Sequence, residues 1–453
     1  MNLDDIHLIK DSRFNVVYHI PSSTLKIVND SAYKVLSLLK EGQSMEIFGD
    51  KKKDVRVFLD SFFDSLAQNN DDALDIGKEY NKQISRITVH VSNDCNLRCR
   101  YCYAQGGHYG GERILMTSNT AEVFVNFCVK EFDKVNRIVF FGGEPLLNPK
   151  VIDIICAKFK QYKAQNKISY IPLFVIVTNG TVLSDEIIDL IQKHIDLVCV
   201  SIDGEKEFHD ANRVFKDGTG SFEKVSSFIT AVQCKTVKSL QYEATYTKKH
   251  IDYGYRRESV MEFLKKRFGL DGTVVDEEGL GYNPLLEFWD KMLELEDDNI
   301  LFEFLPEDFY HIFSKLLNNK DNYFCPVAKR TFAVNCNGDI YACHLLNGKE
   351  HNSLGNIQSK NIFNTPTSYA SFYQKKSFKN TIECEQCWAR RLCGGCTVNG
   401  FYDERKQEFT EKPNVDRCDF MRKYLERIIA FIVRIRKKPM LWNRLIQLSQ
   451  AQN

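Results

Sequence analysis

The apolar residues between positions 85 and 275 follow two alternating periods. Short apolar runs, typical of strands buried on both faces, alternate with segments that carry apolar residues at helical spacing. This alternation predicts βα units around a parallel sheet, arranged as an open or closed barrel. The predicted strands are "RITVHVS" (86–92), "RIVFFGG" (137–143), "IPLFVIVTNG" (171–180), "DLVCVSIDG" (196–204) and "LQYEATYT" (240–247).

The first 80 residues have a different pattern and predict a small module. The apolar runs "FNVVYHI" and "STLKIV", separated by "PSS", are typical of a β-hairpin. A helix is expected next, with Asn29 or Asp30 as its N-cap and Gly42 as its stop, and "KKDVRVFLDSFFDSLAQNN" (52–70) has the apolar spacing of another. A hairpin followed by helices is winged-helix-like, and an ordinary N-terminal cap is the alternative.

Charge is balanced overall but uneven along the chain. The formal net charge is +1, which gives no indication of nucleic-acid binding. Residues 276–308 hold twelve acidic residues and one lysine, which predicts a solvated helix face, or alternatively a docking surface for a basic segment. Residues 421–453 hold eight basic residues and one glutamate around an apolar helix too short to span a bilayer. We expect this helix to pack against the body, with membrane-surface binding as the alternative.

The cysteines narrow the possible chemistry. No signal peptide and no run of about 20 apolar residues is evident, so a cytoplasmic location is expected. Disulfides rarely persist there, and fifteen cysteines therefore indicate metal binding or thiol chemistry. Three of them, Cys95, Cys99 and Cys102, share one loop with the spacing C-x3-C-x2-C. Three thiolates on a four-iron cluster would leave one iron open, whereas a zinc site usually requires a second pair, and none lies nearby.

This loop, with Tyr101 directly before the third cysteine, resembles the signature of the radical S-adenosylmethionine (SAM) superfamily. The resemblance implies that the open iron binds the amino and carboxylate groups of SAM. It also implies a reaction in which one electron from the cluster cleaves SAM, and the resulting 5′-deoxyadenosyl radical abstracts a hydrogen atom. The expected fold is then a partial (β/α)6 barrel, with the N-terminal module and a Cys-rich C-terminal domain attached.

Later strand ends carry further elements similar to those that bind SAM in this superfamily. "GGEP" resembles the motif whose carbonyls and acidic side chain receive the SAM ammonium group, and its glycines permit close backbone approach. Arg213 is expected to pair with the SAM carboxylate, with a surface salt bridge as the alternative. The resemblance implies SAM contacts from Tyr101, Gly142, Gly143, Glu144, Pro145, Thr178, Asn179, Ser201, Asp203 and Arg213.

Eight of the fifteen cysteines lie within residues 325–418, in a pattern that closely resembles the SPASM extension of radical SAM enzymes. The run "CEQCWARRLCGGC" is one residue shorter before Cys396 than the usual SPASM pattern, which puts the role of Cys396 in question. The resemblance implies an outer auxiliary cluster on Cys384, Cys387, Cys393 and Cys418, and an inner one on Cys325, Cys343 and Cys396, making three 4Fe-4S clusters in all.

The remaining cysteines are interpreted as structural. Cys336 is read as a strand residue rather than a ligand, which would leave an iron of the inner cluster open to a substrate thiolate. A zinc knuckle is the rival interpretation of the C-x2-C pairs. Cys128, Cys156, Cys199 and Cys234 lie in apolar patterns and are expected to be buried core residues.

Taken over most of its length, the chain resembles maturases of ribosomally synthesised peptides. The expected parts are a recognition element for the precursor leader (1–80), the radical SAM core (81–275), a bridging helical region (276–324), the SPASM domain (325–420) and a basic C-terminal helix (421–453). The cysteine loop is most similar to maturases that form thioether crosslinks in Cys-rich peptides. The implied partners are a precursor peptide and a flavodoxin, ferredoxin or reductase as electron donor.

Three other functions remain open. A carbon–carbon crosslinking maturase shares the same architecture. A sulfatase-maturing enzyme, which oxidises Cys or Ser, typically has an acidic residue after the cysteine of "GDIYAC", whereas here His344 follows, read as structural by default. Outside enzymes, the rival is a zinc-binding scaffold that docks peptides.

Overall fold

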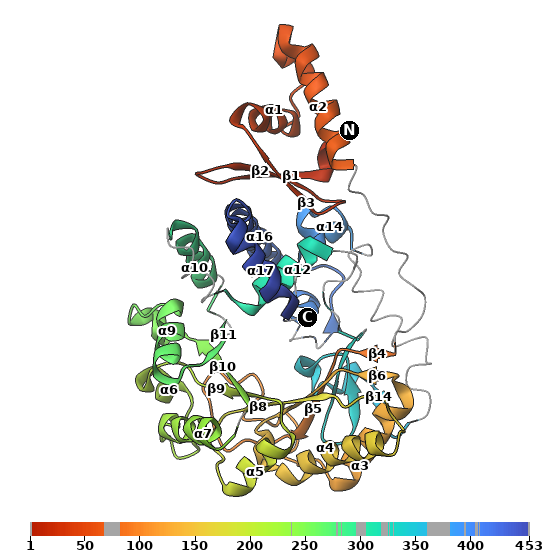
Figure 1. Cartoon of the computed structure of the whole chain (residues 1–453), viewed down its shortest axis with the longest axis vertical. Coiled ribbons are helices and arrows are strands. Elements are labelled where there is room, and N and C mark those ends of the chain that lie inside the picture. The colour runs from red at the N-terminus through yellow and green to blue at the C-terminus, as the bar shows by residue number, and fades with distance from the viewer. Residues whose placement is uncertain are drawn as a thin grey trace.

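A computed structural model of the chain contains three layers (Figure 1). A small N-terminal module lies at one end, a curved sheet covered by helices lies at the other, and further helices lie between them. The structure describes residues 2–67, 82–236, 238–277, 280–281, 283–295, 305–318, 325, 327–328, 330–359, 381–393, 396–403, 406 and 408–451.

The large sheet confirms the predicted α/β architecture. Its nine strands follow the order β11-β10-β9-β8-β7-β5-β12-β13-β14, and neighbours from β11 to β5 run parallel. Five of the six parallel strands were predicted. The sixth, β11, was not, because its sequence "DGTVVD" holds only two strongly apolar side chains. The six parallel strands are β5 (Arg86–Ser92), β7 (Arg137–Gly142), β8 (Leu173–Thr178), β9 (Leu197–Ser201), β10 (Ser239–Tyr246) and β11 (Asp271–Asp276).

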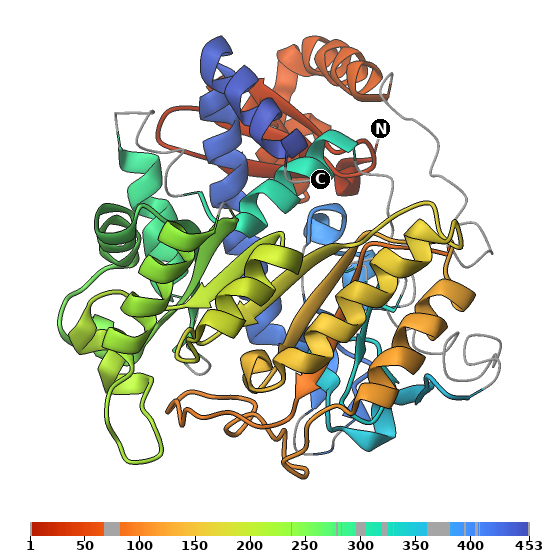
Figure 2. The same ribbon diagram turned by 60° about the horizontal axis from the view of Figure 1, so that its bottom comes forward.

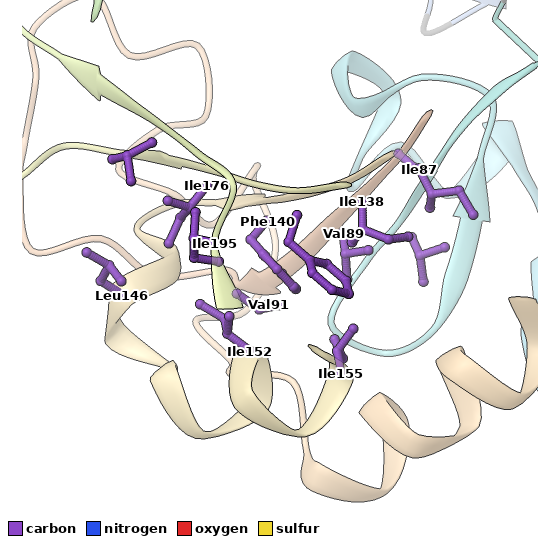
Figure 3. Close-up of a cluster of buried hydrophobic side chains, with 14 of the residues drawn as sticks. Ile87, Val89, Val91, Ile138, Phe140, Leu146, Ile152, Ile155, Ile176 and Ile195 are labelled. Carbon is purple, nitrogen blue, oxygen red and sulfur yellow. The ribbon is translucent and has the colours of Figure 1, made fainter. Parts of the chain in front are cut away.

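Helices cover the outer face of this sheet (Figure 2). Alternate residues of each strand, such as Ile87 and Val89 on β5, point into a core shared with helices (Figure 3). Ile152 and Ile155 of α4 pack against them. His90 follows Val89 and faces the other side of the strand, as the alternation of side chains requires, where it contacts Asn347. The helices are α3 (Ser118–Glu131), α4 (Pro149–Ala164), α5 (Asp185–His194), α6 (Lys206–Asn212), α7 (Phe222–Lys235), α8 (Lys248–Asp252) and α9 (Arg257–Phe268).

The cysteine-rich region continues the same sheet. Strand β12 (Thr331–Val334) pairs in parallel with β5, and the antiparallel strands β13 (Asp339–Tyr341) and β14 (Ser353–Asn356) extend the edge. The barrel and the C-terminal cysteines are therefore joined by backbone hydrogen bonds. Smaller elements are β4 (Gln83–Ile84), β6 (Lys134–Val135), α14 (Ile382–Glu385), α15 (Thr397–Phe401), β15 (Tyr402–Asp403) and β16 (Glu408–Phe409).

The N-terminal module contains the predicted hairpin, formed by β2 (Asn15–His19) and β3 (Thr24–Val28). Asn29 caps α1 (Asp30–Lys40) by accepting a hydrogen bond from the backbone N–H of Ala32, as predicted. Helix α2 (Lys52–Ala67) is also present, and the remainder of the predicted run, 68–70, lies outside the described residues. An additional strand, β1 (Ile6–Lys10), pairs with β2 and was not predicted.

Four helices form a second core between the module and the barrel. Trp289 of α10 is fully buried against Phe309 of α12 and Phe431 of α16. The prediction that the C-terminal apolar helix packs against the body is confirmed, although α16 is continuous across the expected boundary at 420/421. The four helices are α10 (Asn283–Glu294), α12 (Glu307–Asn318), α16 (Val415–Arg436) and α17 (Pro439–Ala451).

The acidic segment 276–308 combines both of its predicted roles where it is described. Asp290 is half exposed, as expected of a solvated face. Its carboxylate also accepts hydrogen bonds of 2.7 and 2.9 Å from the guanidinium of Arg427 on α16. The acidic helix therefore also docks against the basic segment. Residues 278–279, 282 and 296–304 of this segment lie outside the described residues. Among the described helices, none is long and apolar enough to cross a membrane.

Candidate metal centres and cofactor site

The three-cysteine loop directly follows β5, at the carboxyl end of the first barrel strand. Backbone N–H groups of Leu97 and Gly106 lie 3.4 Å from the Sγ atoms of Cys95 and Cys102, respectively. The side-chain amide of Asn179 also donates to Cys95 Sγ, at 3.5 Å. Donors directed at sulfur are one way in which proteins stabilise and tune iron–sulfur clusters.

Burial makes two of these thiols, those of Cys95 and Cys99, difficult to ionise unless a cation is present. It raises the pKa of Cys95 to about 12, and the nearby carboxylate of Glu144 adds to the effect. It raises the pKa of Cys99 to about 11, although Arg213 acts in the opposite direction. Thiolates at these positions therefore require a positive partner, and iron supplies one. The donor set of the loop fits an iron–sulfur cluster.

The glycines of "GGEP" permit the cysteine loop to approach the end of β7. A Cβ at Gly142 would lie 2.1 Å from the carbonyl oxygen of Ser92, and one at Gly143 would lie 2.2 Å from that of Asp94. Gly107, at the far end of the loop, is equally confined, since its Cβ would lie 2.6 Å from Gly143 Cα. Close backbone approach was predicted, and in the structure the neighbour is the cysteine loop itself.

Glu144 connects this motif to the next strand end. Its carboxylate is fully buried and accepts hydrogen bonds from Thr178 Oγ1 and from the backbone N–H of Asn179, both at 2.7 Å. A third bond, of 2.9 Å, comes from the N–H of Leu146 in the turn that Pro145 begins. Burial raises the pKa of Glu144 to about 7. These contacts hold "GGEP" and "TNG" together beside Cys95.

Asp203, Tyr101 and Arg213 form a buried group beside the cysteine loop. The Tyr101 hydroxyl donates a 2.5 Å hydrogen bond to Asp203 Oδ2, and Arg213 Nε lies 3.0 Å from the same oxygen. The guanidinium lies over the Tyr101 ring, 5.4 Å from its centroid. Burial lowers the pKa of Arg213, but the Asp203 carboxylate outweighs this and the pKa is raised. Arg213 is 7% exposed, so the alternative of a surface salt bridge is wrong.

A second set of contacts fixes this group from behind. The N–H of Asp203 donates to Nδ1 of the buried His209, whose Nε2–H donates to Ser221 Oγ at 2.9 Å. Ser221 in turn donates a 2.7 Å hydrogen bond to the carbonyl oxygen of Arg213. Ser201, the last predicted SAM-side residue, is half-buried at the end of β9 and pairs with Glu243 of β10.

The outer group of C-terminal cysteines lines a cavity of about 400 Å³. Burial raises the pKa of Cys384 to about 12, and the sulfurs of Cys418, Cys393 and Cys387 add to the effect. Burial also raises the pKa of Cys418, with Cys393 and Cys387 among the further causes. The four cysteines predicted for the outer cluster are therefore brought together around a partly open cavity.

Cys396 lies between the outer and the inner groups. It lines the outer cavity, and it also packs against the barrel core, as Cys325 and Cys343 do. Cys336 is buried in that core and donates a 3.1 Å hydrogen bond from Sγ to the carbonyl oxygen of His90. It lies in the turn between β12 and β13, so the prediction that it is a strand residue is wrong.

The prediction of four core cysteines elsewhere is half right. Cys128 and Cys156 are buried, as predicted. Cys234 is exposed, and the prediction for it is wrong, because it lies on the solvent side of α7. Cys199 is only half-buried, because the alternation of β9 buries its neighbours Val198 and Val200 and turns Cys199 to the other face.

Within the described ranges, no three His, Cys, Asp or Glu side chains converge on a point suited to one metal ion. A four-iron cluster distributes its thiolates over separate irons, so this arrangement is compatible with clusters.

Several supporting residues carry no recognisable sequence signal. Asn96 connects the cysteine loop to the third strand end, since its side chain bonds to Thr181 Oγ1 at 2.7 Å and to Asn179 Nδ2 at 2.9 Å. His90 on β5 is fully buried, and its Nδ1 lies 2.9 Å from the side-chain amide of Asn347. Asparagine and histidine in a loop or strand are too common to be singled out without the folded neighbours.

Two family profiles match the chain. Residues 89–242 match the radical SAM superfamily, and residues 325–388 match SPASM, described as an iron-sulfur cluster-binding domain. An uncharacterized protein of Methanocaldococcus jannaschii is 30% identical over 316 residues, which cover 65% of this chain and 98% of the relative. The chain belongs to the radical SAM superfamily and carries a SPASM domain. It is therefore an enzyme of the class that binds SAM and 4Fe-4S clusters.

Named relatives and solved structures agree with this class. The radical SAM cyclopropyl synthase TigE of Paramaledivibacter caminithermalis is 22% identical over 93% of both chains. A cysteine-type anaerobic sulfatase-maturating enzyme of Clostridium novyi is 26% identical, covering 70% of this chain and 89% of the relative. The structure of anSMEcpe with bound AdoMet superposes with a TM-score of 0.63 at 21% identity, covering 81% and 96% of the two chains. Streptococcus suis SuiB bound to precursor peptide SuiA gives 0.50 at 13% identity, covering 90% and 97%.

Proposed function

We propose that this enzyme modifies a ribosomally synthesised precursor peptide, forming thioether bonds between cysteine sulfurs and carbon atoms. The observation that carries the proposal is the coexistence of three parts in one chain. These are the three-cysteine loop bound to "GGEP" and "TNG", the two C-terminal cysteine groups, and an N-terminal module with a three-stranded sheet. The likeness to SuiB, which was solved with its precursor peptide, covers 90% of the chain and supports this combination.

In this proposal Cys95, Cys99 and Cys102 hold the SAM-binding cluster. When bound, the cluster and SAM supply a 5′-deoxyadenosyl radical that abstracts hydrogen from an unactivated C–H bond. Arg213 provides a fixed positive charge for the SAM carboxylate, because Asp203 and Tyr101 hold it in place.

The other SAM-side residues shape the site around this charge. Gly142 and Gly143 bring their backbone against the cysteine loop, and Pro145 begins the turn that follows. Thr178 and Asn179 are fixed by Glu144 at the neighbouring strand end. In the proposal, Ser201 belongs to the same rim, at the end of β9.

The two C-terminal groups are proposed to hold auxiliary clusters. The outer cluster would be held by Cys384, Cys387, Cys393 and Cys418. These four cysteines line the cavity of about 400 Å³. The inner cluster would use Cys325, Cys343 and Cys396. Thioether formation removes two electrons overall, so the auxiliary clusters give the second electron a place to go.

The precursor leader is proposed to bind at the N-terminal module by strand addition. The sheet has the order β1-β2-β3, so β3 is an edge strand. Among the described strands, none pairs with its outer side, and Ile27 on it is 44% exposed. An edge of this kind offers free backbone groups to an added strand. A flavodoxin, ferredoxin or reductase is proposed as the electron donor.

Two other activities are favoured by specific relatives. TigE, by its name, is a cyclopropyl synthase, and its likeness over 93% of both chains favours carbon–carbon bond formation as a second candidate. The Clostridium novyi relative favours sulfatase-type oxidation of Cys or Ser. Against the latter, His344 follows Cys343 in the place where an acidic residue is typical, and burial lowers the pKa of His344 to about 4. That imidazole is neutral at pH 7 and does not reproduce a carboxylate.

The first test is the cofactor content and the product. We expect about twelve irons per chain after anaerobic reconstitution, and about eight in a Cys95/Cys99/Cys102→Ala variant. Stoichiometric zinc in place of iron would make the protein a peptide-docking scaffold. The reconstituted enzyme is then incubated with SAM, reductant and a short Cys-rich peptide encoded beside its gene. A mass decrease of two hydrogens with one blocked thiol identifies a thioether, and the same decrease with every thiol free identifies a carbon–carbon bond.

A further inference from the structure

Cations surround the outer cysteine group more densely than sequence reasoning indicated. The lining of the cavity includes Cys396 in addition to the four cysteines of the outer group. It contains one acidic residue, Glu383, which forms an exposed ion pair with Lys412. The cationic residues of the lining are Arg390, Lys412, Arg417 and Arg422.

Arg417 lies directly beside Cys418 and has an unsatisfied donor. Its Nε atom is buried and forms no hydrogen bond with any described residue. A buried N–H group that lacks an acceptor costs free energy, so such groups are rare in folded proteins. The sulfur atoms of a bound cluster are acceptors, and the cavity that Arg417 lines is where they would lie.

Arg422 lines the cavity from α16, about one helical turn after Cys418. Its side chain bonds both to the Asp419 carboxylate and to the Cys387 sulfur. Two further cations orient the backbone of the loop, since Arg390 donates to the carbonyl oxygen of Cys387 at 3.2 Å and Lys315 to that of Cys393 at 2.9 Å.

We propose that Arg417 and Arg422 raise the reduction potential of the four-iron cluster held in the outer cavity, which makes this cluster the preferred electron acceptor within the enzyme. The inference rests on the proposed function, because it requires a cluster at these cysteines. Reduction adds one electron to a cluster that its four thiolates already make negative. Fixed positive charge next to the sulfurs, in a partly buried site, favours the more negative reduced form.

The consequence is a direction for electron flow. Bond formation would release one electron from the substrate. Transfer of this electron would be most favourable to the cluster with the highest reduction potential. The inner group packs against the barrel core, and its Cys396 also lines the outer cavity. The arginines therefore favour transfer outward over return to the SAM-side cluster.

The test is an EPR-monitored redox titration of the reconstituted full-length enzyme with low-potential mediators. The signal that disappears in a Cys384/Cys387/Cys393/Cys418→Ala variant identifies the outer cluster. In Arg417→Gln and Arg422→Gln we expect the midpoint of this signal to fall by up to about 59 mV, a tenfold change in the one-electron equilibrium. Arg422→Lys should retain most of the wild-type potential, because it retains the charge.

The matched control is Arg427→Gln, the same substitution on the same helix. Arg427 pairs with Asp290 and does not line the cavity, so its loss should leave the midpoint unchanged. An unchanged midpoint in both cavity variants, with iron content and signal amplitude intact, would overturn the inference while the proposed function stands. Absence of any iron difference between wild type and a Cys384/Cys387/Cys393/Cys418→Ala variant would overturn both, because no outer cluster would exist. If a glutamine variant fails to fold, the midpoint potentials of Arg422→Lys and Arg422→Met are compared instead, and equal midpoints would overturn the inference.

Discussion

The indole ring of Trp388 stacks on the imidazole ring of His7, with centroids 3.8 Å apart and planes 2° from parallel. Trp388 follows Cys387 in the outer cysteine loop, whereas His7 belongs to β1 of the N-terminal module. His7 also bonds to Glu426 of α16 at 2.8 Å, and Tyr18 of β2 contacts the edge of the same indole. One face of the small sheet is thus attached to the domain that carries the auxiliary cysteines.

Trp388→Ala should loosen this attachment. Removal of the stacked ring is expected to cost about 1 kcal/mol, so that β1 amides exchange about fivefold faster with solvent deuterium. Hydrogen–deuterium exchange read by mass spectrometry measures the change. Trp388→Phe retains an aromatic ring and should exchange at nearly the wild-type rate. Identical exchange in all three proteins would show that the stack does not hold the module.

Gly143→Ala should disrupt the SAM site by steric conflict alone. The new methyl group would lie 2.2 Å from the Asp94 carbonyl oxygen, and a backbone neighbour cannot rotate away. We expect roughly a hundredfold weaker SAM binding, equivalent to about 3 kcal/mol. Gly111→Ala in the neighbouring cysteine loop is the control, because its nearest neighbour would lie at 3.5 Å. Calorimetry on reconstituted protein compares the two, and equal affinities would contradict the close approach.

Cys95→Ala should abolish SAM cleavage, measured as 5′-deoxyadenosine released under dithionite. The four-iron cluster would lose one of its three thiolates. Cys384→Ala should instead impair folding or turnover and leave the first cluster able to form. Cys156→Ala is the control, because this thiol lies on the buried face of α4 and belongs to none of the motifs. Retained cleavage in the Cys95 variant would refute the assignment of the loop.

Deletion of residues 1–80 should weaken binding of the precursor leader by about tenfold or more without stopping uncoupled SAM cleavage. Because the deletion also uncovers the second core, a milder variant is needed. Ile27→Glu places a charge on the exposed edge strand β3 and should weaken leader binding alone. Fluorescence anisotropy with a labelled leader peptide measures both. Unchanged affinity in both variants would reject the module as the binding site.

Local motifs made most of the barrel predictable. Each βα unit buries an apolar strand and one helix face, and both periods are visible along the chain. Strand β1 was not predicted, because its two faces are buried by different parts of the chain. Ile6 packs against the helices of the N-terminal module, and Ile9 packs into the second core. The sequence around β1 gives no indication of the second core, which is formed by residues far along the chain.

The residues of the candidate site were predictable where a sequence motif identifies them, and not where only tertiary contacts bring them to the site. The cysteine loop and "GGEP" are read from the sequence because only glycine permits the backbone approach at Gly143. The positioning chain from Asp203 through His209 to Ser221 was not predictable, since it joins residues of three different segments. The orphaned Nε of Arg417 likewise becomes visible only when the cavity around it is known.

His209 predicts how stability responds to acid. Burial lowers its pKa to about 4, against an ordinary value of 6.5 in the unfolded chain. As the pH falls below 6.5, the unfolded state takes up the proton first, so stability is lost progressively until the pH passes the folded pKa. Between pH 6.5 and about 5 this costs about 2 kcal/mol. His209→Gln keeps one acceptor and one donor but cannot titrate, so its melting temperature should fall less over this range. His351→Gln, at an exposed histidine, is the control, and equal slopes in all three proteins would contradict the prediction.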